Sequence, residues 1–561
     1  MVSPTKVLRP LPLLTAGVLA GPVLLGLFGT LLPAFGLGPL GPGLRLSAFA
    51  AVRDWPGLVD AMAVSVTSGV LSTIGALAIA SLILAGWHGT AAFRWLERLL
   101  SPLLAVPHAA AALGLAFLVA PSGWLMRLPA LALGWDVPPD LLIVQDRHGL
   151  TLTAGLIAKE LPFLLLMMLA ALGQVDQARR MAVARSLGAG RVAAWFKAVF
   201  PGVYAQVRLP VLVVLVYGMT NVDVATILGP NTPPSLSVQV TRWMLDPDLG
   251  QRSVAAAAAM VQGGLVLMVL AGWVGGERVT ACLGRRWIWS GLSLPEGPAR
   301  GLGLILATVS AIAVLAGIAA LALWSVAAGW RFPDLAPDAL TLRSWSRFGP
   351  EMTMVAACTM EIAALSTLIA VLLAIGCLEA EHRFGLSVGQ RALWLLYLPL
   401  LIPQVAFLPG LLLIPATIGN GYEMPMVIFG HVIFVLPYVF LSLSGPFRAW
   451  DGRFARVGAG LGASPDRVLW SLRMPMLLAP VLTAAAVGMA VSVGQYLPTL
   501  LLGGGRVSTL ATEAVALAAG GDRRAIGVWG LGQTAAAFGP FVLALAIPAL
   551  VFRNRRGLRH G

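Results

Sequence analysis

Two stretches of this sequence share one plan: ARSLGAGRVAAWFKAVFP at residues 184–201 and GAGLGASPDRVLWSLRMP at residues 458–475. Each contains a glycine that is followed thirteen residues later by a proline, in the pairs Gly188–Pro201 and Gly462–Pro475. Apolar residues recur at helical spacing between the two, with basic residues among them. This pattern predicts a short amphipathic helix that begins after a tight turn and ends at the proline, where the chain re-enters the membrane.

The second stretch has a clear signal for the start of this helix. Ser464 is a favoured capping residue, Pro465 fits the first helical turn, and Asp466 favours the positive end of the helix. We therefore expect the helix to begin at this point. A helix of this kind can lie on a bilayer surface or dock into a groove on a partner protein.

The composition indicates what surrounds these two stretches. The chain of 561 residues is 58% hydrophobic and 11% charged, with a mean hydropathy of +0.86. Soluble domains are usually about 45–50% apolar and about 25% charged. So few charges cannot cover a soluble surface of this size, and the chain is predicted to be an all-α transmembrane protein.

The apolar residues gather in twelve blocks, each near the roughly 20 residues that cross the hydrocarbon layer. The first block continues well past the length of a signal-peptide core, so we interpret it as a retained span. The predicted spans are 11–35, 60–87, 101–120, 149–173, 205–228, 252–274, 301–325, 352–377, 394–417, 425–445, 476–498 and 525–552.

The net charge of +14 comes from basic residues whose placement indicates how the chain is oriented in the membrane. With twelve spans and a cytoplasmic N-terminus, most of the lysines and arginines fall in the inside loops, as the positive-inside rule requires. We therefore predict a multi-pass protein of a bacterial inner membrane with both termini in the cytoplasm. This distribution also argues against nucleic acid as a partner.

The sequence repeats itself at the scale of half the chain. We predict a first transmembrane half at 1–280, a cytoplasmic linker at 281–300 and a second transmembrane half at 301–561, with about six helices in each half. Besides the two opening stretches, three pairs of positions match in order: Leu71-Ser72-Thr73 with Leu365-Ser366-Thr367, Pro107 with Pro403, and Leu161-Pro162-Phe163 with Leu436-Pro437-Tyr438.

The two opening stretches resemble the EAA loop of binding-protein-dependent ABC importer permeases. That family pattern is roughly Glu-Ala-Ala, three residues, Gly, and later Ile-x-Leu-Pro. The match covers nearly the whole chain, because the flanking spans also agree in order. The resemblance is to fused two-half permeases similar to those of ferric-iron and putative thiamine importers, and it implies a MetI-like pseudodimer fold.

The resemblance implies partners and roles. Each loop would dock on an ABC ATPase subunit, two copies in all, and a periplasmic solute-binding protein would deliver a small solute, thiamine-like or ferric iron. The sequence differs from the family pattern at the glutamate, because Ala182 and Arg456 occupy the two positions where the family has it. The residues that carry the predicted coupling role are Ala184, Leu187, Gly188, Ala189, Trp195, Pro201, Leu461, Gly462, Ala463, Leu472 and Pro475.

Polar residues inside the spans suggest the pathway, because ionisable groups in hydrocarbon are costly and usually face the interior of the bundle. Asn221 lies twenty residues after Pro201, and Gln495 lies twenty residues after Pro475. This symmetry predicts that these residues lie on two facing walls of one solute pathway. The candidate lining residues are Asn221, Asp223, Gln495, Tyr496 and Glu160, against the alternative that they form ordinary helix–helix contacts.

The sequence offers no sign of catalysis. It has no Gly-x-x-x-x-Gly-Lys-Ser/Thr motif, and its only lysines are Lys6, Lys159 and Lys197, so ATP hydrolysis is expected from a separate subunit. Its three cysteines and six histidines are not spaced as a metal site. We therefore expect no catalytic residue, cofactor or resident metal. The main alternative is a twelve-helix secondary transporter or facilitator, for which Glu160 and Glu361 are the only plausible coupling carboxylates.

Overall fold

The computed structural model describes residues 8–37, 43–291, 296–386, 390–412 and 421–553. These residues are almost entirely helical, as the composition predicts. The N-terminal half, residues 8–291, contains α2 (Leu11–Ala34), α3 (Ser47–Asp54), α4 (Leu58–Trp87), α5 (Ala91–Leu100), a 3-10 turn (Ser101–Leu104), α6 (His108–Val119), α7 (Trp124–Leu133), α8 (Leu150–Leu172), α9 (Gln177–Ser186), α10 (Arg191–Ala194), a π-helical turn (Trp195–Val199), α11 (Phe200–Thr220), α12 (Asp223–Leu228), α13 (Leu236–Met244) and α14 (Gln251–Trp289).

The C-terminal half, residues 296–553, repeats this order and adds a short hairpin. It contains α15 (Glu296–Val326), β1 (Ala327–Gly329), β2 (Ala339–Leu340), α16 (Arg343–Phe384), α17 (Gln390–Leu401), α18 (Gln404–Leu411), α20 (Glu423–Ala449), α21 (Arg453–Gly460), α22 (Pro465–Val468), a π-helical turn (Leu469–Arg473), α23 (Met474–Met476), α24 (Leu478–Val493), α25 (Leu497–Leu502), α26 (Leu510–Ala518) and α27 (Arg523–Val551).

Ten helices in the described ranges are long and apolar enough to cross a membrane, and two bent helix pairs raise the number to as many as twelve. The bends are 88° between Leu401 and Gln404 and 75° between Met476 and Leu478. The predicted ninth span, 394–417, is described only as far as residue 412. The all-α architecture with about twelve membrane helices is therefore confirmed.

Two helix boundaries differ from the sequence prediction. The linker expected at 281–300 is helical for much of its length, because α14 continues through Trp289 and α15 begins at Glu296; residues 292–295 lie outside the described part. The predicted spans 205–228 and 476–498 are also not continuous. Each is interrupted at a polar residue, Asn221 or Gln495, and followed by a separate short helix.

The two halves agree in register over a long stretch. Helices α10, α12 and α13 and the first π-helical turn recur 274 residues later as α22, α25, α26 and the second π-helical turn, with identical lengths. Hydrogen bonds recur as well. The main-chain N–H of Leu236 donates to Ser65 Oγ, and that of Leu510 donates to Thr359 Oγ1, each at 3.0 Å. Duplicated sequence therefore produces duplicated local structure.

The first helix of each half packs against the other half. Helix α2 lies on α18 and α16, and α15 lies on α6 and α4. Paired glycines permit both close crossings: a Cβ on Gly317 would lie 2.7 Å from the carbonyl carbon of Gly114, and a Cβ on Gly29 would lie 2.5 Å from the carbonyl oxygen of Gly410. Small residues let membrane helices approach closely. This exchange ties the halves into one body.

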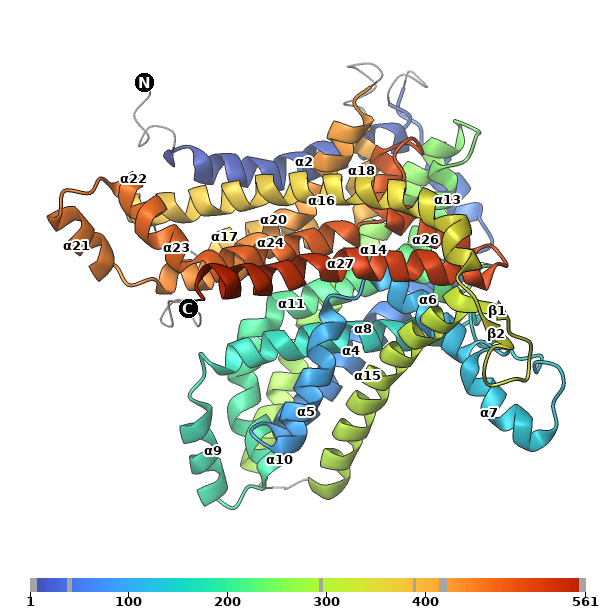
Figure 1. Ribbon diagram of the computed structural model, residues 1–561, viewed down its shortest axis with the longest axis horizontal. Coiled ribbons are helices and arrows are strands. Elements are labelled where there is room, and N and C mark those ends of the chain that lie inside the picture. The colour runs from blue at the N-terminus through green and yellow to red at the C-terminus, as the bar shows by residue number, and fades with distance from the viewer. Residues whose placement is uncertain (1–7, 38–42, 292–295, 387–389, 413–420, 554–561) are drawn as a thin grey trace.

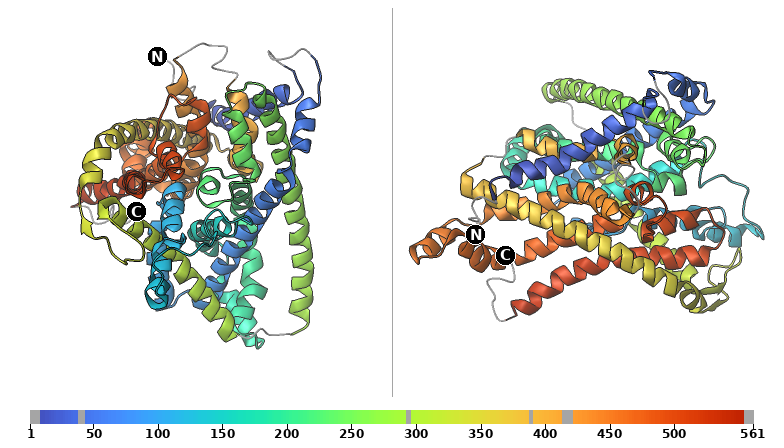
Figure 2. Two further views of the ribbon diagram at one scale, coloured as in Figure 1. Left: turned by 90° about the vertical axis from the view of Figure 1, so that its right-hand side faces the viewer. Right: turned by 90° about the horizontal axis from the view of Figure 1, so that it is seen from above.

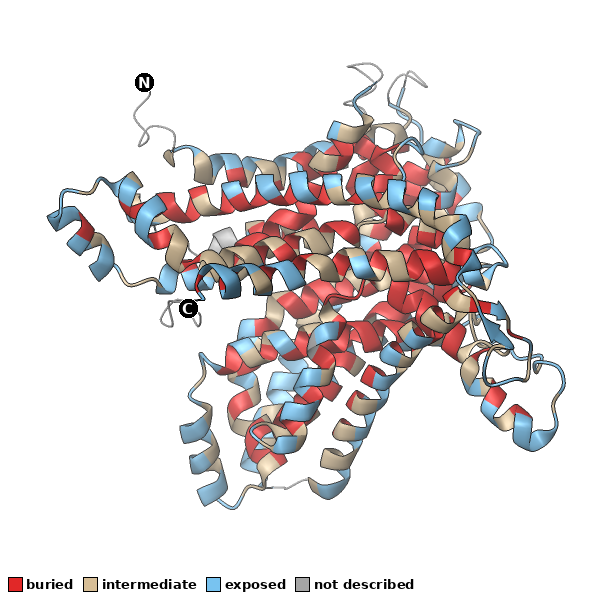
Figure 3. Cartoon of the chain, viewed as in Figure 1, coloured by how far each residue is buried: buried red, intermediate tan, exposed pale blue. Residues whose placement is uncertain are grey.

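The arrangement has two distinct ends (Figures 1 and 2). Helices α9 and α10, helices α21 and α22, the start of α2 and the end of α27 lie toward one end, and α7, α13, α26 and the hairpin lie toward the other. Buried residues concentrate in the middle of the bundle (Figure 3). Exposed apolar side chains cover outer helices instead, such as Ile305 and Val309 of α15 and Leu545 of α27, which suits contact with lipid.

Candidate functional site

The two opening stretches form matching helical loops. We call residues 176–201 loop 1 and residues 450–475 loop 2. At the end of α9, Gly188 has φ +83°, and at the end of α21, Gly462 has φ +78°. The N–H of Ala189 donates to Ala184 O at 3.2 Å, and that of Ala463 donates to Gly458 O at 2.9 Å. Both turns are Schellman-type helix ends, in which glycine adopts the left-handed conformation without strain.

Each turn presents a leucine at its tip. Leu187 is 81% exposed and Leu461 is 84% exposed, at positions 274 residues apart. The neighbouring Gly188 and Gly462 are exposed too, and a Cβ on either would meet no atom within 4 Å. Of the other predicted coupling residues, Pro201 and Leu472 are exposed, and Ala184, Ala189, Ala463 and Pro475 are half-buried.

Trp195 differs from the other coupling candidates because it is fully buried. Its ring packs against Phe196 and Phe200, with centroids 5.1 and 5.5 Å away. The apolar residues that recur at helical spacing in loop 1 are Val192, Trp195, Phe196 and Val199. They form a stripe that faces the protein core, with Phe196 half-buried and the other three buried. This stripe fixes loop 1 to the membrane helices and leaves the opposite face of the loop for contacts outside the chain.

Main-chain acceptors and a glutamate hold the short helix of loop 1. The Arg191 guanidinium donates to His88 O at 2.6 Å and to Ala85 O at 3.2 Å, at the end of α4. The N–H of Val192 donates to Glu296 Oε1 at 3.0 Å, at the start of α15. Loop 1 thus rests on a helix of its own half and on the first helix of the other half.

Charged side chains hold the short helix of loop 2. Glu379 of α16 accepts from Arg473 at 2.5 Å and from Arg383 at 2.6 Å, and the side chains of all three are less than 10% exposed. Arg383 also pairs with Asp466 in α22 at 2.7 Å. The Arg473 guanidinium stacks 4.1 Å from the centre of the Trp450 ring. As the sequence predicts, Ser464 caps α22 by accepting from the N–H of Arg467 at 3.3 Å.

A hollow of about 670 Å³ adjoins loop 1, and a second hollow of about 380 Å³ lies at the other end of the molecule. Asp176, Arg180, Leu187, Lys197 and, from the end of α14, Ile288 are among the residues that line the larger hollow. The positions of the two absent glutamates, Ala182 and Arg456, are exposed on α9 and α21. These surfaces are open to a partner.

The predicted pathway residues of the N-terminal half come together in the interior. Glu160 of α8, which is 6% exposed, lies 3.2 Å from His108 Nε2. The His108 ring lies 4.9 Å from the Tyr217 ring, and Tyr217 donates to Asp223 at 3.4 Å. Asn221 has a structural task, because its side chain accepts from the N–H of Ala225 at 2.9 Å and so begins α12.

Residues of the C-terminal half complete this polar cluster. Tyr438 of α20 lies near Glu160, and Tyr496 lies near Asp223, without a direct hydrogen bond among the described contacts. Gln495 is half-buried, and its main-chain oxygen accepts from Thr499 Oγ1 at 3.1 Å. Asp223 thus lies in the vicinity of Tyr496, the neighbour of Gln495. We call Glu160, His108, Tyr217, Asp223, Tyr438 and Tyr496 the interior cluster.

Sequence reasoning missed several members of this site. His108 and Tyr217 join the cluster through contacts between different helices, although His108 carries one signal in the sequence, since it directly follows Pro107 at the start of a span. In the C-terminal half, His431 bonds Ser492 Oγ at 2.7 Å and Thr499 Oγ1 at 2.9 Å, which makes it a helix-to-helix tie. Within the described ranges, no three His, Cys, Asp or Glu residues are placed to hold a metal ion.

Comparisons with known proteins find several relatives of this chain. The inner membrane ABC transporter permease protein YnjC of Escherichia coli is 30% identical over 539 residues, which cover 95% of this chain and 96% of the relative. The molybdenum transport system permease protein ModB of Mycobacterium tuberculosis is 31% identical over 32% of this chain and 75% of its own length. The spermidine/putrescine transport system permease protein PotC of Haemophilus influenzae is 23% identical over 25% of this chain and 54% of its own length.

No protein-family profile matches the chain. No solved structure matches it either. The assignment of this chain to a protein family therefore depends on these relatives, above all on the full-length agreement with YnjC, and on the duplicated geometry described above.

Proposed function

This chain belongs to the membrane-spanning permeases of ABC transporters, and from that premise we propose that it is the permease of an importer. It forms the path of a small solute across the inner membrane between its two halves, 1–280 and 301–561. Relatives such as ModB match about a third of this chain over three quarters of their own length, which supports a fusion of two permease units.

We propose that loops 1 and 2 face the cytoplasm and each dock on one ATPase subunit, two copies in all. The observation that carries this proposal is the pair of identical elements, each with an exposed leucine, a left-handed glycine, a short helix and a proline. The start of α2 and the end of α27 lie toward the same side as these loops, which supports cytoplasmic termini (Figure 1). The opposite end would then receive a periplasmic solute-binding protein.

We further propose that the solute is a cation, thiamine-like or ferric iron. The interior cluster offers two carboxylates, Glu160 and Asp223, and the faces of Tyr217, Tyr438 and Tyr496. Carboxylates attract a cation, and aromatic faces bind organic cations best when water is excluded. A thiamine-like organic cation uses both features. The name of PotC gives two polyamines as its solutes, which are also organic cations.

The alternative of a secondary transporter or facilitator is not favoured. By their names, YnjC is an ABC transporter permease, and ModB and PotC are permease proteins of transport systems.

A substitution test of the loops uses bulky residues at the two left-handed glycines. Gly188→Leu and Gly462→Leu are each expected to abolish co-purification of the ATPase or to uncouple its hydrolysis from uptake. Gly272→Leu is the matched control, because Gly272 of α14 lies outside both loops, is helical and exposed, and a Cβ added to it would meet no atom within 4 Å. Normal transport and co-purification in both test variants would contradict the proposal.

A second test concerns the interior cluster. Asp223→Ala combined with Gln495→Ala, and separately Glu160→Gln, should reduce uptake of labelled thiamine while the ATPase still co-purifies. Asp54→Asn, at an exposed position, serves as the control. If these variants take up each tested cation at the wild-type rate, the assignment of these residues to the solute pathway is overturned.

A further inference from the structure

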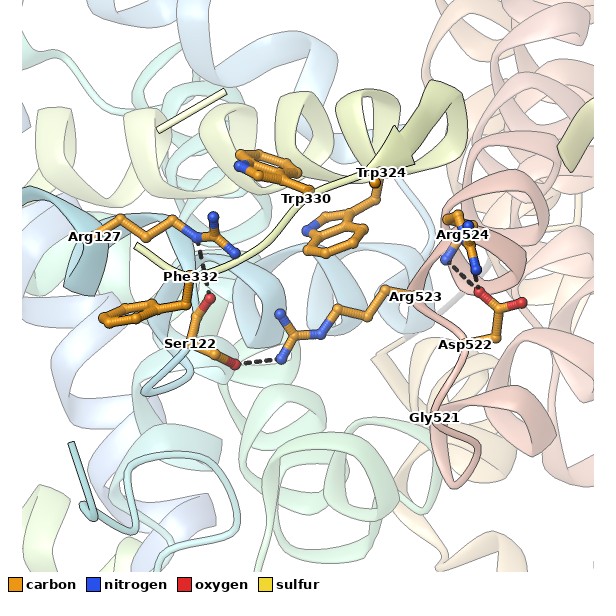
Figure 4. Close-up of a pocket in the computed structure, with 10 residues that line it drawn as sticks. Ser122, Arg127, Trp324, Trp330, Phe332, Gly521, Asp522, Arg523 and Arg524 are labelled. Carbon is orange, nitrogen blue, oxygen red and sulfur yellow. Dashed lines mark hydrogen bonds and ion pairs between the residues drawn. The ribbon is translucent and has the colours of Figure 1, made fainter. Parts of the chain in front are cut away.

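The hollow of about 380 Å³ lies at the end of the molecule opposite loops 1 and 2 (Figures 1 and 4). Its volume falls within the range of about 300–1,000 Å³ that is common for small-molecule sites. Three separate segments build it: the turn between α6 and α7, the end of α15 with its hairpin, and the start of α27. The lining residues include Ser122, Arg127, Trp324, Trp330, Phe332 and Arg523.

Two arginines give this hollow a positive charge. Arg127 is 2% exposed and donates to the main-chain oxygens of Ser122, Arg331 and Asp334. Arg523 donates to Ser122 Oγ and lies over the Trp324 ring at 5.2 Å. Among the described residues, neither guanidinium forms an ion pair with a carboxylate, and the nearby Asp334 carboxylate offsets only part of the charge that the two arginines bring together.

The neighbouring acid does not neutralise this pair. Asp522 bonds the side chain of Arg524 at 3.4 Å and the N–H of the same residue at 3.0 Å. Figure 4 shows the Arg523 guanidinium pointing toward Ser122 and Phe332, away from Asp522. Arg523 also begins α27, a helix of 29 residues whose positive end adds to the local field. A partly buried charge of this kind is stabilised by an anion.

The surroundings place this hollow at the boundary of the apolar layer. Trp324 lies in the last turn of α15, a helix of 31 residues whose exposed face is apolar from Leu302 to Leu315. Tryptophan is enriched where membrane helices reach the headgroups. Helix α7, which carries Arg127, exposes Leu125, Leu128 and Leu131 at the spacing of one helical face. An anion that binds here therefore meets apolar side chains beside the charges.

We propose that this hollow binds the phosphate of a phospholipid headgroup, with Arg523 and Ser122 as donors and Arg127 as the fixed charge behind them. The aromatic rings of Trp324, Trp330 and Phe332 pack against the headgroup, and the acyl chains continue along the apolar surface. The bound lipid joins segments from both halves at the end opposite the helical loops.

Retained phospholipid measured by native mass spectrometry tests this proposal. The whole chain is reconstituted in bilayers of phosphatidylethanolamine and phosphatidylglycerol and then released into mild detergent. We expect one tightly held phospholipid per chain, and at least about a tenfold drop in its retention in Arg523→Gln, because a charge-assisted contact is lost. The matched control, Arg343→Gln, changes an exposed arginine at the start of α16 that does not line the hollow, and should retain the lipid.

Three further arms make the result decisive. Arg523→Lys keeps the charge and should retain lipid better than Arg523→Gln, and both variants are compared by thermal unfolding. Equal retention in the wild type and Arg523→Gln would overturn the proposal. So would displacement of the lipid by inorganic phosphate alone, which would indicate a site for free anions. Unchanged lipid retention together with lost docking of a solute-binding protein would assign the hollow to a protein carboxylate instead.

Discussion

Loops 1 and 2 have the same backbone but are fixed to the membrane helices by different chemistry. In loop 1, beside the bonds of Arg191 and Glu296, Val199 and Ala85 of α4 are both buried in one apolar core cluster. In loop 2 the equivalent positions hold Arg473 and Glu379, which form a buried ion pair. The two equivalent pairs of positions, 85 with 199 and 379 with 473, thus differ together.

This difference shows that the duplicated fold depends on complementarity between helix and loop rather than on particular residues. Each left-handed glycine, π-helical turn and exposed leucine recurs at the same interval, although the bonds underneath do not. The two loops should therefore respond equally to changes in the turn and unequally to changes in the anchor.

The largest effect is expected at the anchor of loop 2. Glu379→Ala leaves Arg473 buried without a partner, and loss of one member of a buried ion pair costs about 3–5 kcal/mol. The free energy of unfolding in lipid micelles measures this loss. Glu381→Ala is the matched control on the same helix, because its partner Arg448 is 45% exposed and the pair contributes little.

A double variant sharpens the same comparison. Glu379→Ala with Arg473→Val gives loop 2 the residues that loop 1 has at Ala85 and Val199. Because apolar residues of suitable size can replace a buried ion pair at little cost, the double variant should recover most of the stability lost by Glu379→Ala. A double variant as unstable as the sum of its single variants would contradict the equivalence of the two anchors.

The next effect concerns loop 1. Arg191→Ala removes the charge-assisted hydrogen bonds from the guanidinium to Ala85 O and His88 O. A hydrogen bond of this type contributes about 1.5–3 kcal/mol to the free energy of unfolding. Protease sensitivity of loop 1 and the unfolding free energy should both change. Arg185→Ala, an exposed position on α9, should change neither. If both variants behave like the wild type, the anchor of loop 1 is apolar alone.

The left-handed glycines should give equal and smaller effects. Gly188→Ala and Gly462→Ala place a Cβ in the left-handed conformation, which costs about 1–2 kcal/mol. The space around both is open, so the two losses in unfolding free energy should agree. Gly460→Ala, in a helix, should be neutral or stabilising. A large difference between Gly188→Ala and Gly462→Ala would mean that the two turns are not equivalent.

The smallest effect is expected at the side-chain cap of the short helix, which α22 of loop 2 has and α10 of loop 1 lacks. Ser464→Ala removes the acceptor for the N–H of Arg467 and should cost about 1 kcal/mol of unfolding free energy. Ser464→Asp keeps an acceptor and should restore the stability. A neutral Ser464→Ala variant would show that the ion pair between Arg383 and Asp466 is sufficient to position α22.

Much of the fold could be predicted from the sequence, because membrane spans and capping signals are local. The twelve apolar blocks, the duplication and the start of α22 at Ser464 all follow from composition and spacing. The breaks at Asn221 and Gln495 could not be predicted this way, since one polar residue in an apolar run is compatible with a continuous helix. The exchange of α2 and α15 between halves depends on glycine contacts between distant segments.

The candidate site was harder to predict for the same reason. The spacing of Trp195 indicated one face of a helix but not whether that face meets the core or a partner. Glu379 and Arg473 are 94 residues apart, and their pairing is visible only in three dimensions. The cluster around Glu160 likewise needs His108 and Tyr438, which come from other helices.

Cross-linking at the tips of the two loops tests whether both of them couple this permease to its ATPase. Leu187→Cys and Leu461→Cys occupy equivalent exposed positions, and each is introduced with the exposed Cys282 replaced by serine. Reconstituted with its ATPase, each variant should cross-link to one ATPase subunit, and the chain with both cysteines should capture two. Cross-linking at one tip only, or at neither, would contradict a coupling role for both loops.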